Sequence, residues 1–205
     1  MKKQHLLILA LCLFTVAFYA QEGHVQQPGN GFTAAGLNTG ASKTGSTYFG
    51  ENAGKNATGN TNTFIGFNTG INNSGVGGVF VGYRAGYSNT TGRFNLMIGD
   101  RAGQANTKGE LNTFLGTVSG YKNTEGSHNT FLGMYSGFYN TTGHRNTFIG
   151  YNSGFNNKTA NDNVMIGNLA GNSSSSGWYN SFIGSSSGRN NIDGHRNVFN
   201  GYSSG

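Results

Sequence analysis

The chain has 205 residues, of which 36 are glycine and only 10% are charged, and its formal net charge at pH 7 is +6. Its lysines and arginines are scattered without a run, which excludes the basic patch of a nucleic-acid-binding protein. Its single cysteine, Cys12, lies in the N-terminal apolar segment, so the rest of the chain has no disulfide to stabilise it.

Residues 1–20 have the pattern of a secretory signal peptide. Lys2 and Lys3 precede an apolar run from Leu6 to Ala20. The run is too short to cross a bilayer, and a basic start followed by such a run is typical of an exported protein. We expect cleavage after Ala20, which leaves a chain of net charge +4 that is secreted or displayed on a bacterial cell surface without membrane insertion. An uncleaved anchor is the alternative.

Residues 21–45 contain a degenerate copy of a repeat, around Gly36 and Gly40, and we expect them to cap the repeats that follow. In residues 46–205 a motif close to Asn-Thr-Phe-Ile-Gly-x-x-Ser-Gly-x-x-Asn-Thr-Thr-Gly occurs ten times, with a period of 16 or 17 residues. The copies align on one glycine, here called the anchor glycine: Gly50, Gly66, Gly82, Gly99, Gly116, Gly133, Gly150, Gly167, Gly184 and Gly201. A period below about 20 residues predicts a solenoid of stacked coils, or rungs, which we expect to continue or to stack on another copy beyond Gly205.

The residues before each anchor glycine alternate in character, which predicts a β-strand with two different faces. The residue two before it is aromatic or Met and forms the aromatic column, which includes Phe64, Phe80, Phe114, Phe131, Phe148 and Phe182. The residue one before it forms the aliphatic column, which includes Ile65, Ile98, Leu115, Leu132, Ile149, Ile166 and Ile183. The aromatic column shares its face with Asn, and the aliphatic column shares the other face with Thr or Val.

A second glycine follows each anchor glycine by four residues, and the residue before this second glycine is always small. Small residues at every level let the backbones approach closely. A third glycine, such as Gly126, follows an Asn-Thr-Thr-like stretch and supplies a return turn. Each copy therefore predicts one rung of two short strands and two turns, stacked on the next rung at about 4.8 Å.

Two sets of asparagines recur in register. The strand Asn ladder lies four residues before the anchor glycine: Asn95, Asn112, Asn129, Asn146, Asn163, Asn180 and Asn197. The turn Asn ladder lies seven residues after it: Asn73, Asn89, Asn106, Asn123, Asn140, Asn157 and Asn191. Stacked amides hydrogen-bond along the axis and to turn backbone, so we interpret both ladders as structural.

The two apolar columns predict self-association. Adjacent strand residues point to opposite faces, so only one column can fill a thin coil. The other column then forms a long apolar stripe of a kind that soluble monomers rarely expose. We expect this stripe to be buried in a homotrimer around a threefold axis. A wider coil, in which Phe tucks under a turn, is the alternative.

The runs from Asn112 to Gly116 and from Asn146 to Gly150, each followed by x-x-Ser-Gly, resemble the head repeats of YadA-type trimeric autotransporter adhesins. Similar repeats occur in bacterial and phage fibre proteins. The resemblance covers about residues 45–205 and implies a left-handed parallel β-roll. It also implies that three chains form a cell-surface head that binds host or matrix macromolecules. The period here is longer, and Phe stands where those heads have an alanine-like column.

Aromatic residues gather at variable positions after the anchor glycine. The candidate binding or interface residues are Tyr83, Tyr87, Tyr121, Phe138, Tyr139, Tyr151 and Phe155. Such a strip can stack on sugars or anchor protein contacts, and packing within turns or an interface is the alternative.

We expect no enzyme, no metal and no cofactor. His144 and His195 share a rung position but lie three rungs apart, about 14 Å, which is too far to share an ion. We interpret them as solvated turn histidines. The serine column that includes Ser119 and Ser136 has no histidine partner of the kind that a catalytic triad requires.

The sequence therefore predicts a structural and adhesive fibre segment that is secreted or lies on the cell surface. It would bind extracellular protein or glycan surfaces by multivalent display along a rigid rod. An ice-binding solenoid, with its Thr column ordering water, and a self-assembling extracellular filament subunit are the alternatives.

Overall fold

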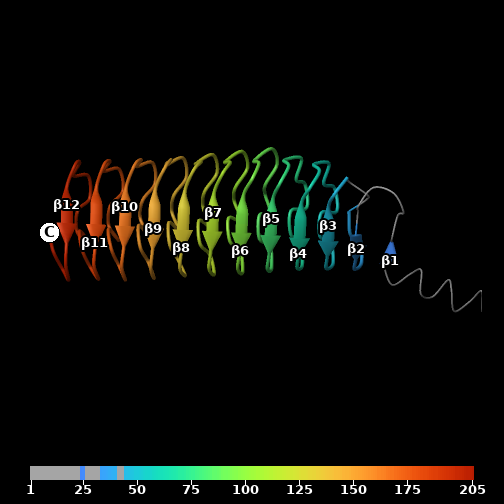
Figure 1. The fold of residues 1–205 in the computed structure, drawn as a ribbon, viewed down its shortest axis with the longest axis horizontal. Coiled ribbons are helices and arrows are strands. Elements are labelled where there is room, and N and C mark those ends of the chain that lie inside the picture. Colours follow the sequence, from blue (N-terminus) through green and yellow to red (C-terminus); the bar gives the residue numbers. More distant parts are fainter. Residues whose placement is uncertain (1–23, 26–32, 41–43) are drawn as a thin grey trace, which may run out of the picture.

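The computed structural model describes residues 24–25, 33–40 and 44–205, which form an all-β solenoid (Figure 1). The predicted signal peptide, residues 1–20, lies outside the described residues. The strands are β1 (His24–Val25), β2 (Thr33–Ala35), β3 (Thr47–Phe49), β4 (Thr63–Ile65), β5 (Val79–Val81), β6 (Leu96–Ile98), β7 (Thr113–Leu115), β8 (Thr130–Leu132), β9 (Thr147–Ile149), β10 (Val164–Ile166), β11 (Ser181–Ile183) and β12 (Val198–Asn200).

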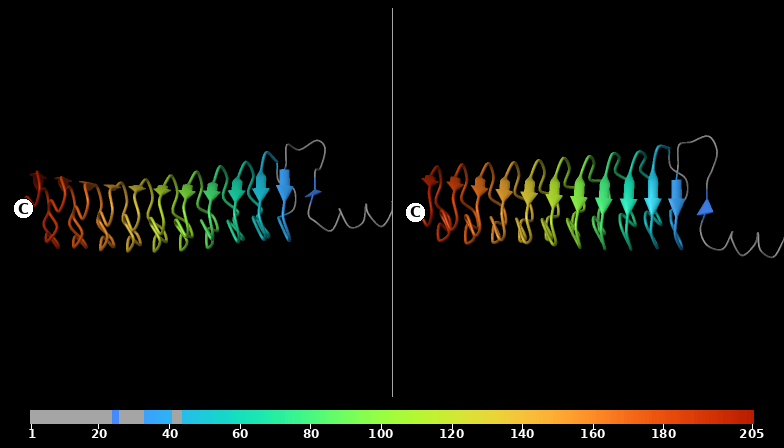
Figure 2. Two further views of the ribbon diagram at one scale, coloured as in Figure 1. Left: turned by 90° about the horizontal axis from the view of Figure 1, so that it is seen from below. Right: turned by 60° about the horizontal axis from the view of Figure 1, so that its bottom comes forward.

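Strands β2 to β12 form one parallel sheet in chain order, and β1 pairs antiparallel with β2. The register repeats from rung to rung, so that Phe114 pairs with Phe131 and Leu115 pairs with Leu132. Figures 1 and 2 show the rungs following one another along a single axis. The predicted parallel β-solenoid of about ten rungs is confirmed.

The degenerate copy before residue 45 extends this sheet. β2 pairs in parallel with β3, and Gly36 has a φ of +128°, close to the +131° of the anchor glycine Gly50. The copy therefore adopts the same strand and turn as the complete repeats. Residues 21–23, 26–32 and 41–43 of this segment lie outside the described part of the chain.

Each complete rung has one strand, and the prediction of two strands per rung is wrong. After the anchor glycine Gly116 the chain turns at Val118 and Gly120, which have φ values of +51° and +58°. Residues in this left-handed region cannot continue an extended strand. The return segments still stack by backbone bonds, such as Gly120 N–H to the Ser136 carbonyl at 3.0 Å and Thr124 N–H to the Thr141 carbonyl at 2.9 Å.

The aromatic column fills the interior, and the aliphatic column faces outward. From Tyr48 through Phe182 every aromatic-column side chain is completely buried. The rings of Phe114, Phe131 and Phe148 stack with centroids 5.0 and 4.8 Å apart. Each ring lies against the second glycine of its rung; a Cβ on Gly120 would come within 2.7 Å of the Phe114 ring. The coil is therefore thin, with a core one side chain thick.

The strand Asn ladder joins each rung to the next from Asn95 to Asn197. Its Oδ1 atoms accept from the backbone N–H of the following ladder residue, as Asn112 Oδ1 does from Asn129 at 3.0 Å. Its Nδ2 atoms donate to the carbonyl of the third glycine, as Asn112 does to Gly126 at 2.8 Å. These buried amides therefore satisfy backbone groups that have no strand partner, and the structural interpretation of this ladder is confirmed.

The turn Asn ladder runs beside the strand Asn ladder, because both donate to the carbonyl of the third glycine, as Asn112 and Asn123 do to Gly126. Asn123 donates to Asn106 Oδ1 at 2.6 Å and to the Gly126 carbonyl at 3.0 Å, and Asn140 donates to Asn123 Oδ1 at 2.6 Å. The structural interpretation holds here too, because each amide from Asn89 to Asn140 joins its own turn to the rung before it.

This second ladder breaks at Asn157. Ala160 occupies the third-glycine position of that rung, and a Cβ at the matching Gly126 would lie 2.4 Å from Oδ1 of Asn123, the ladder residue of its own rung. The next residue in the column is Ser174, which has no amide. Among the described residues, Asn140 Oδ1, both amide atoms of Asn157 and Ser174 Oγ are buried and find no hydrogen-bond partner.

The break predicts that two equivalent substitutions have unequal effects. Asn123→Leu removes three hydrogen bonds and leaves Asn106 Oδ1 buried without a donor, so we expect a loss of about 1–3 kcal/mol in the free energy of unfolding. Asn157→Leu removes none, and we expect a change below about 1 kcal/mol. Denaturant unfolding of both variants measures the difference, and equal losses would contradict the broken ladder.

Candidate interaction surfaces

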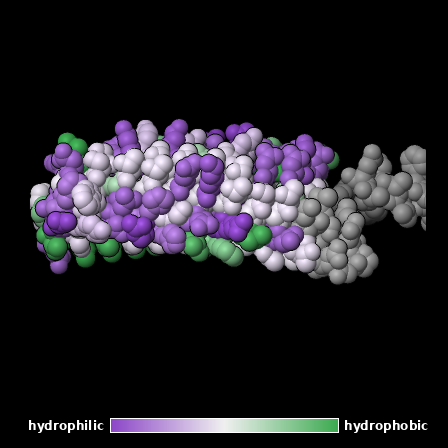
Figure 3. All heavy atoms as spheres, turned by 90° about the horizontal axis from the view of Figure 1, so that it is seen from above, coloured by the Kyte–Doolittle hydropathy of each residue, from purple (hydrophilic) through white to green (hydrophobic). Residues whose placement is uncertain are grey.

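The aliphatic column forms one continuous outward row on the sheet. Ile65, Leu115, Leu132 and Ile183, the last residues of their strands, remain 38–42% exposed. The Thr or Val three residues before the anchor glycine points to the same side, because strand side chains alternate. Viewed from above, hydrophobic residues gather along one long edge of the rod (Figure 3). From β3 to β11 the fold thus leaves one apolar side chain of each strand at least partly exposed to solvent.

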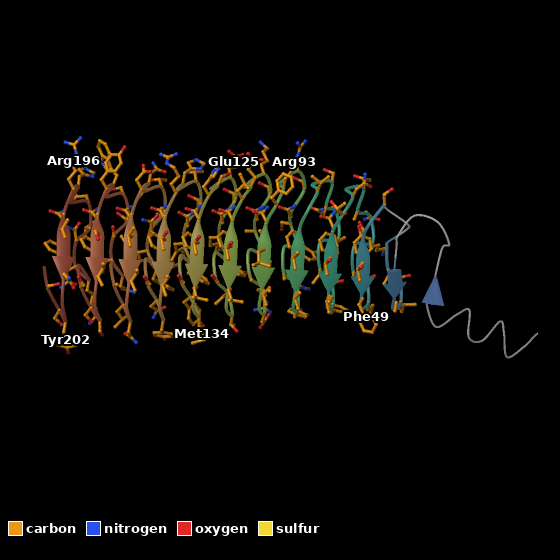
Figure 4. All side chains as sticks on the ribbon, viewed as in Figure 1. Phe49, Arg93, Glu125, Met134, Arg196 and Tyr202 are labelled. Carbon is orange, nitrogen blue, oxygen red and sulfur yellow. The ribbon has the colours of Figure 1, made fainter. Side chains whose placement is uncertain are left out.

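The two ends of the rungs differ in chemistry. Figure 4 shows Phe49, Met134 and Tyr202 along the edge where the strands end, and Arg93, Glu125 and Arg196 along the opposite edge. Exposed apolar residues continue past the strand ends at the position after the anchor glycine: Phe67, Tyr83, Met134, Tyr151 and Tyr202. The apolar surface therefore continues from the sheet onto the return segment.

Five of the seven predicted aromatic residues form one cluster on this return segment. Tyr121, Phe138 and Phe155 stack in three successive rungs, with centroids 5.1 and 5.3 Å apart. Tyr139 packs edge-on against Phe138 and Phe155 at 4.8 and 5.2 Å. Tyr151 joins the cluster through Tyr135, which the sequence analysis missed. Tyr135 meets Tyr151 at 6.2 Å and Phe155 at 6.1 Å, in both cases edge to face.

Tyr135 was missed because it lies two residues after the anchor glycine, where no other copy has an aromatic residue. Its φ is +61°, an unusual conformation for a bulky side chain. That backbone conformation belongs to the turn and recurs at this position in every complete rung. A strip defined only by aromatic-rich columns therefore does not include it.

The cluster encloses a shallow hollow of about 340 Å³, lined by Tyr135, Tyr151, Asn152 and Phe155. Asn152 Oδ1 is shielded from solvent and accepts no hydrogen bond from the described residues. The aromatic walls of the hollow are therefore open to solvent, whereas the Asn152 oxygen is not.

Tyr83 and Tyr87 lie apart from this cluster and surround an arginine instead. The Arg84 guanidinium lies 5.1 Å from the Tyr83 ring centroid and 5.4 Å from that of Tyr87, and Arg101 lies 5.5 Å from Tyr83. Phe67 stacks on Tyr83 at 5.7 Å. These contacts are cation–π and stacking interactions that hold the side chains together.

The two histidines of the shared rung position are not simply solvated. His144 Nδ1 accepts from the Ser127 backbone N–H at 3.0 Å, and His195 Nδ1 accepts from that of Trp178 at 3.1 Å. Each ring thus supports the preceding rung. Within residues 24–25, 33–40 and 44–205 no three His, Cys, Asp or Glu side chains gather into a group able to hold a metal ion.

Charged residues pair across rungs on the surface. Arg145 makes two hydrogen bonds to the Asp162 carboxylate, at 2.6 and 2.9 Å. These bonds lower the pKa of Asp162 and raise that of Arg145. The Arg145 side chain is 60% exposed and that of Asp162 is 22% exposed, so solvent screens the pair and it contributes little stability.

Comparison of the chain with protein families, with curated proteins and with solved structures found no match. None of the described residues forms a helix with the length and apolarity needed to cross a membrane.

Proposed function

We propose that the chain is a structural and adhesive fibre segment that is secreted or displayed on a cell surface. It binds extracellular macromolecular surfaces by repeating weak contacts along a rigid rod. The observation that carries this proposal is the combination of a rod whose interior is hydrogen-bonded in every rung with exposed apolar side chains repeated on its outside. Repetition at a fixed spacing raises avidity without requiring a single strong site.

The proposal includes a homotrimer of the kind implied by the resemblance to YadA-type adhesin heads. The aliphatic column places Leu115, Leu132 and their equivalents one above another at the strand spacing of about 4.8 Å. A straight apolar row of this length packs well against the same row of another copy. Three copies around one axis would bury every row at once, with no row left for further association.

Light scattering on the exported chain tests this assembly. We expect a trimer mass for the wild type and a monomer mass for the double variant Leu115→Glu, Leu132→Glu, because the trimer would bury these carboxylates without partners. Lys108→Glu is the matched control. Lys108 is exposed, and its ion pair with Glu125 lies at a turn, so this variant should remain trimeric. A monomeric wild type would overturn the trimer.

Adhesion is measured on the same three proteins. Retention on surfaces coated with extracellular-matrix protein or with polysaccharide should fall by about 10²-fold or more in the monomeric double variant, because multivalent contact is lost. The Lys108→Glu control should bind as the wild type does. A trimeric wild type that adheres to neither surface would overturn the adhesive function. The proposal of a structural fibre segment would then stand without it.

An ice-binding function is the second candidate, since the outward sheet face carries Thr47, Thr63, Thr113, Thr130 and Thr147 in one row. The row is interrupted by Val79, Leu96, Val164, Ser181 and Val198. Thermal hysteresis of the purified chain tests this candidate. A difference between the melting and freezing temperatures of ice in its solution would favour ice binding over adhesion.

A further inference from the structure

We propose that the break in the turn Asn ladder is a binding site for a buried water molecule. The water joins Asn157, which follows β9, to Ser174, which follows β10. It lies in the space that an Asn amide fills in the complete part of the ladder. The inference does not depend on the adhesive function proposed above, because it concerns the interior of the rod.

The break leaves a group of polar atoms enclosed in the protein. Asn140, Asn157 and Ser174 lie in three successive rungs, and all three residues are completely buried. Asn140 Oδ1, both amide atoms of Asn157 and the Ser174 hydroxyl lack a hydrogen-bond partner within the described part of the chain. Each such atom costs free energy, because it has lost its bonds to bulk water without gaining others. Internal waters bind at groups of this kind.

Ala160 explains why Asn157 has left the ladder. In the complete rungs, the Oδ1 atom of the turn Asn lies where a Cβ on the third glycine would be, as Asn123 Oδ1 does beside Gly126. Ala160 carries that Cβ, so the Asn157 amide cannot take the same position. It therefore loses the bond that its amide nitrogen would donate to Asn140 Oδ1, of the kind that Asn140 itself donates to Asn123 at 2.6 Å.

Ser174 provides the space. A serine side chain has two heavy atoms fewer than an asparagine side chain, which is about the room that one water needs. In a complete rung the amide nitrogen of the turn Asn donates to the Oδ1 of the rung before and to the third-glycine carbonyl, as Asn123 does at 2.6 and 3.0 Å. The equivalent acceptors here are Asn157 Oδ1 and the Gly177 carbonyl. Gly177 accepts from Asn163 at 2.8 Å, and the second lone pair of its oxygen can accept another bond.

A water is the occupant whose hydrogen bonds fit these atoms. It can donate to Asn157 Oδ1 and to the Gly177 carbonyl, and it can accept from the Ser174 hydroxyl. A cation would bring a charge into a buried site whose polar side chains are all neutral, which is costly. An anion would face the two acceptor oxygens of Asn157 and Gly177, which repel it. Water alone both donates and accepts without carrying a charge.

This site is compatible with the small stability effect that we expect of Asn157→Leu. Fixing a water costs entropy, which offsets part of what its hydrogen bonds contribute. Loss of the water together with its partner therefore changes the free energy of unfolding less than loss of a direct bond does. The test consequently has to detect the water itself.

A crystal structure of the wild-type chain, at a resolution that shows ordered waters, tests the proposal. We expect one water within about 2.7–3.2 Å of the Asn157 amide, the Ser174 hydroxyl and the Gly177 carbonyl. An empty space would overturn the proposal, as would a direct hydrogen bond between Asn157 and Ser174. Density with the six or more oxygen neighbours of a metal ion would also overturn it.

Ser174→Asn gives a second measurement, in solution. This variant supplies the missing amide and should displace the water, so oxygen-17 relaxation dispersion should count one long-lived internal water per chain fewer than in the wild type. Ser176→Asn is the matched control, because Ser176 is exposed, and it should keep the wild-type count. Equal counts in all three proteins would contradict the site. If Ser174→Asn does not fold, the wild-type crystal structure decides.

Discussion

Gly116→Ala is expected to be among the most destabilising single substitutions in the rod. Gly116 has a φ of +137°, and an added Cβ would lie 2.7 Å from the carbonyl carbon and oxygen of Gly133 and 3.1 Å from the Met134 nitrogen. The backbone strain costs about 1–3 kcal/mol, and the overlap with the next rung adds a similar amount. Because the overlap is with backbone, no side-chain rotation relieves it. Thermal or denaturant unfolding measures the loss.

Gly201→Ala separates these two causes. Gly201 has nearly the same backbone conformation, with a φ of +126°, but in the described structure an added Cβ meets nothing within 4 Å. We therefore expect Gly201→Ala to show only the strain. If the two variants lose equal stability, contact between rungs is not the reason for glycine at this position.

Phe131→Ala is expected to lower the free energy of unfolding by about 3–5 kcal/mol. The ring is completely buried and stacks between Phe114 and Phe148 at 5.0 and 4.8 Å. The core is one ring thick, so no second layer of side chains can move in to fill the space. In a solenoid each rung is stabilised by its contacts with the two rungs next to it. Hydrogen exchange should therefore show the greatest loss of protection in the rungs of β7, β8 and β9.

The adjacent residue provides the control. Leu132→Ala removes an outward side chain that is 39% exposed, so it should leave the stability of a single chain nearly unchanged. In the trimer proposed above it should instead weaken association. A Leu132→Ala monomer as unstable as the Phe131→Ala chain would show that the aliphatic column belongs to the core.

Several features of the fold followed directly from local pattern. The spacing of the anchor glycines predicted the register in which Phe114 lies over Phe131 and Phe148. The alternation in Asn-Thr-Phe-Ile predicted that Asn and Phe share a face. The recurrence of Asn112 and Asn129 predicted an amide ladder, because identical side chains in register can bond only along the axis. Each inference depended only on the rung period and the strand alternation.

The interaction surfaces were less predictable. The sequence grouped Tyr83 and Tyr87 with the later aromatics, whereas the structure places Arg84 against these two rings, apart from the cluster. It missed Tyr135, and it gave no sign that Asn152 Oδ1 would be unpaired beside aromatic rings. These features depend on how side chains of neighbouring rungs meet across a turn. The turn dihedrals set that geometry, and composition does not reveal them.

The sequence by itself determined the period, the parallel register, the shared faces and the positions that must remain small. Only the tertiary structure decided that the aromatic column points inward, that each rung has one strand, and that the turn Asn ladder breaks at Asn157. Both columns are apolar, so hydrophobicity alone cannot choose between them. The choice comes from the direction in which the chain turns after the anchor glycine. Positive φ values at the anchor glycine, two residues later and at the second glycine fold the return segment over the aromatic side and leave the aliphatic side open.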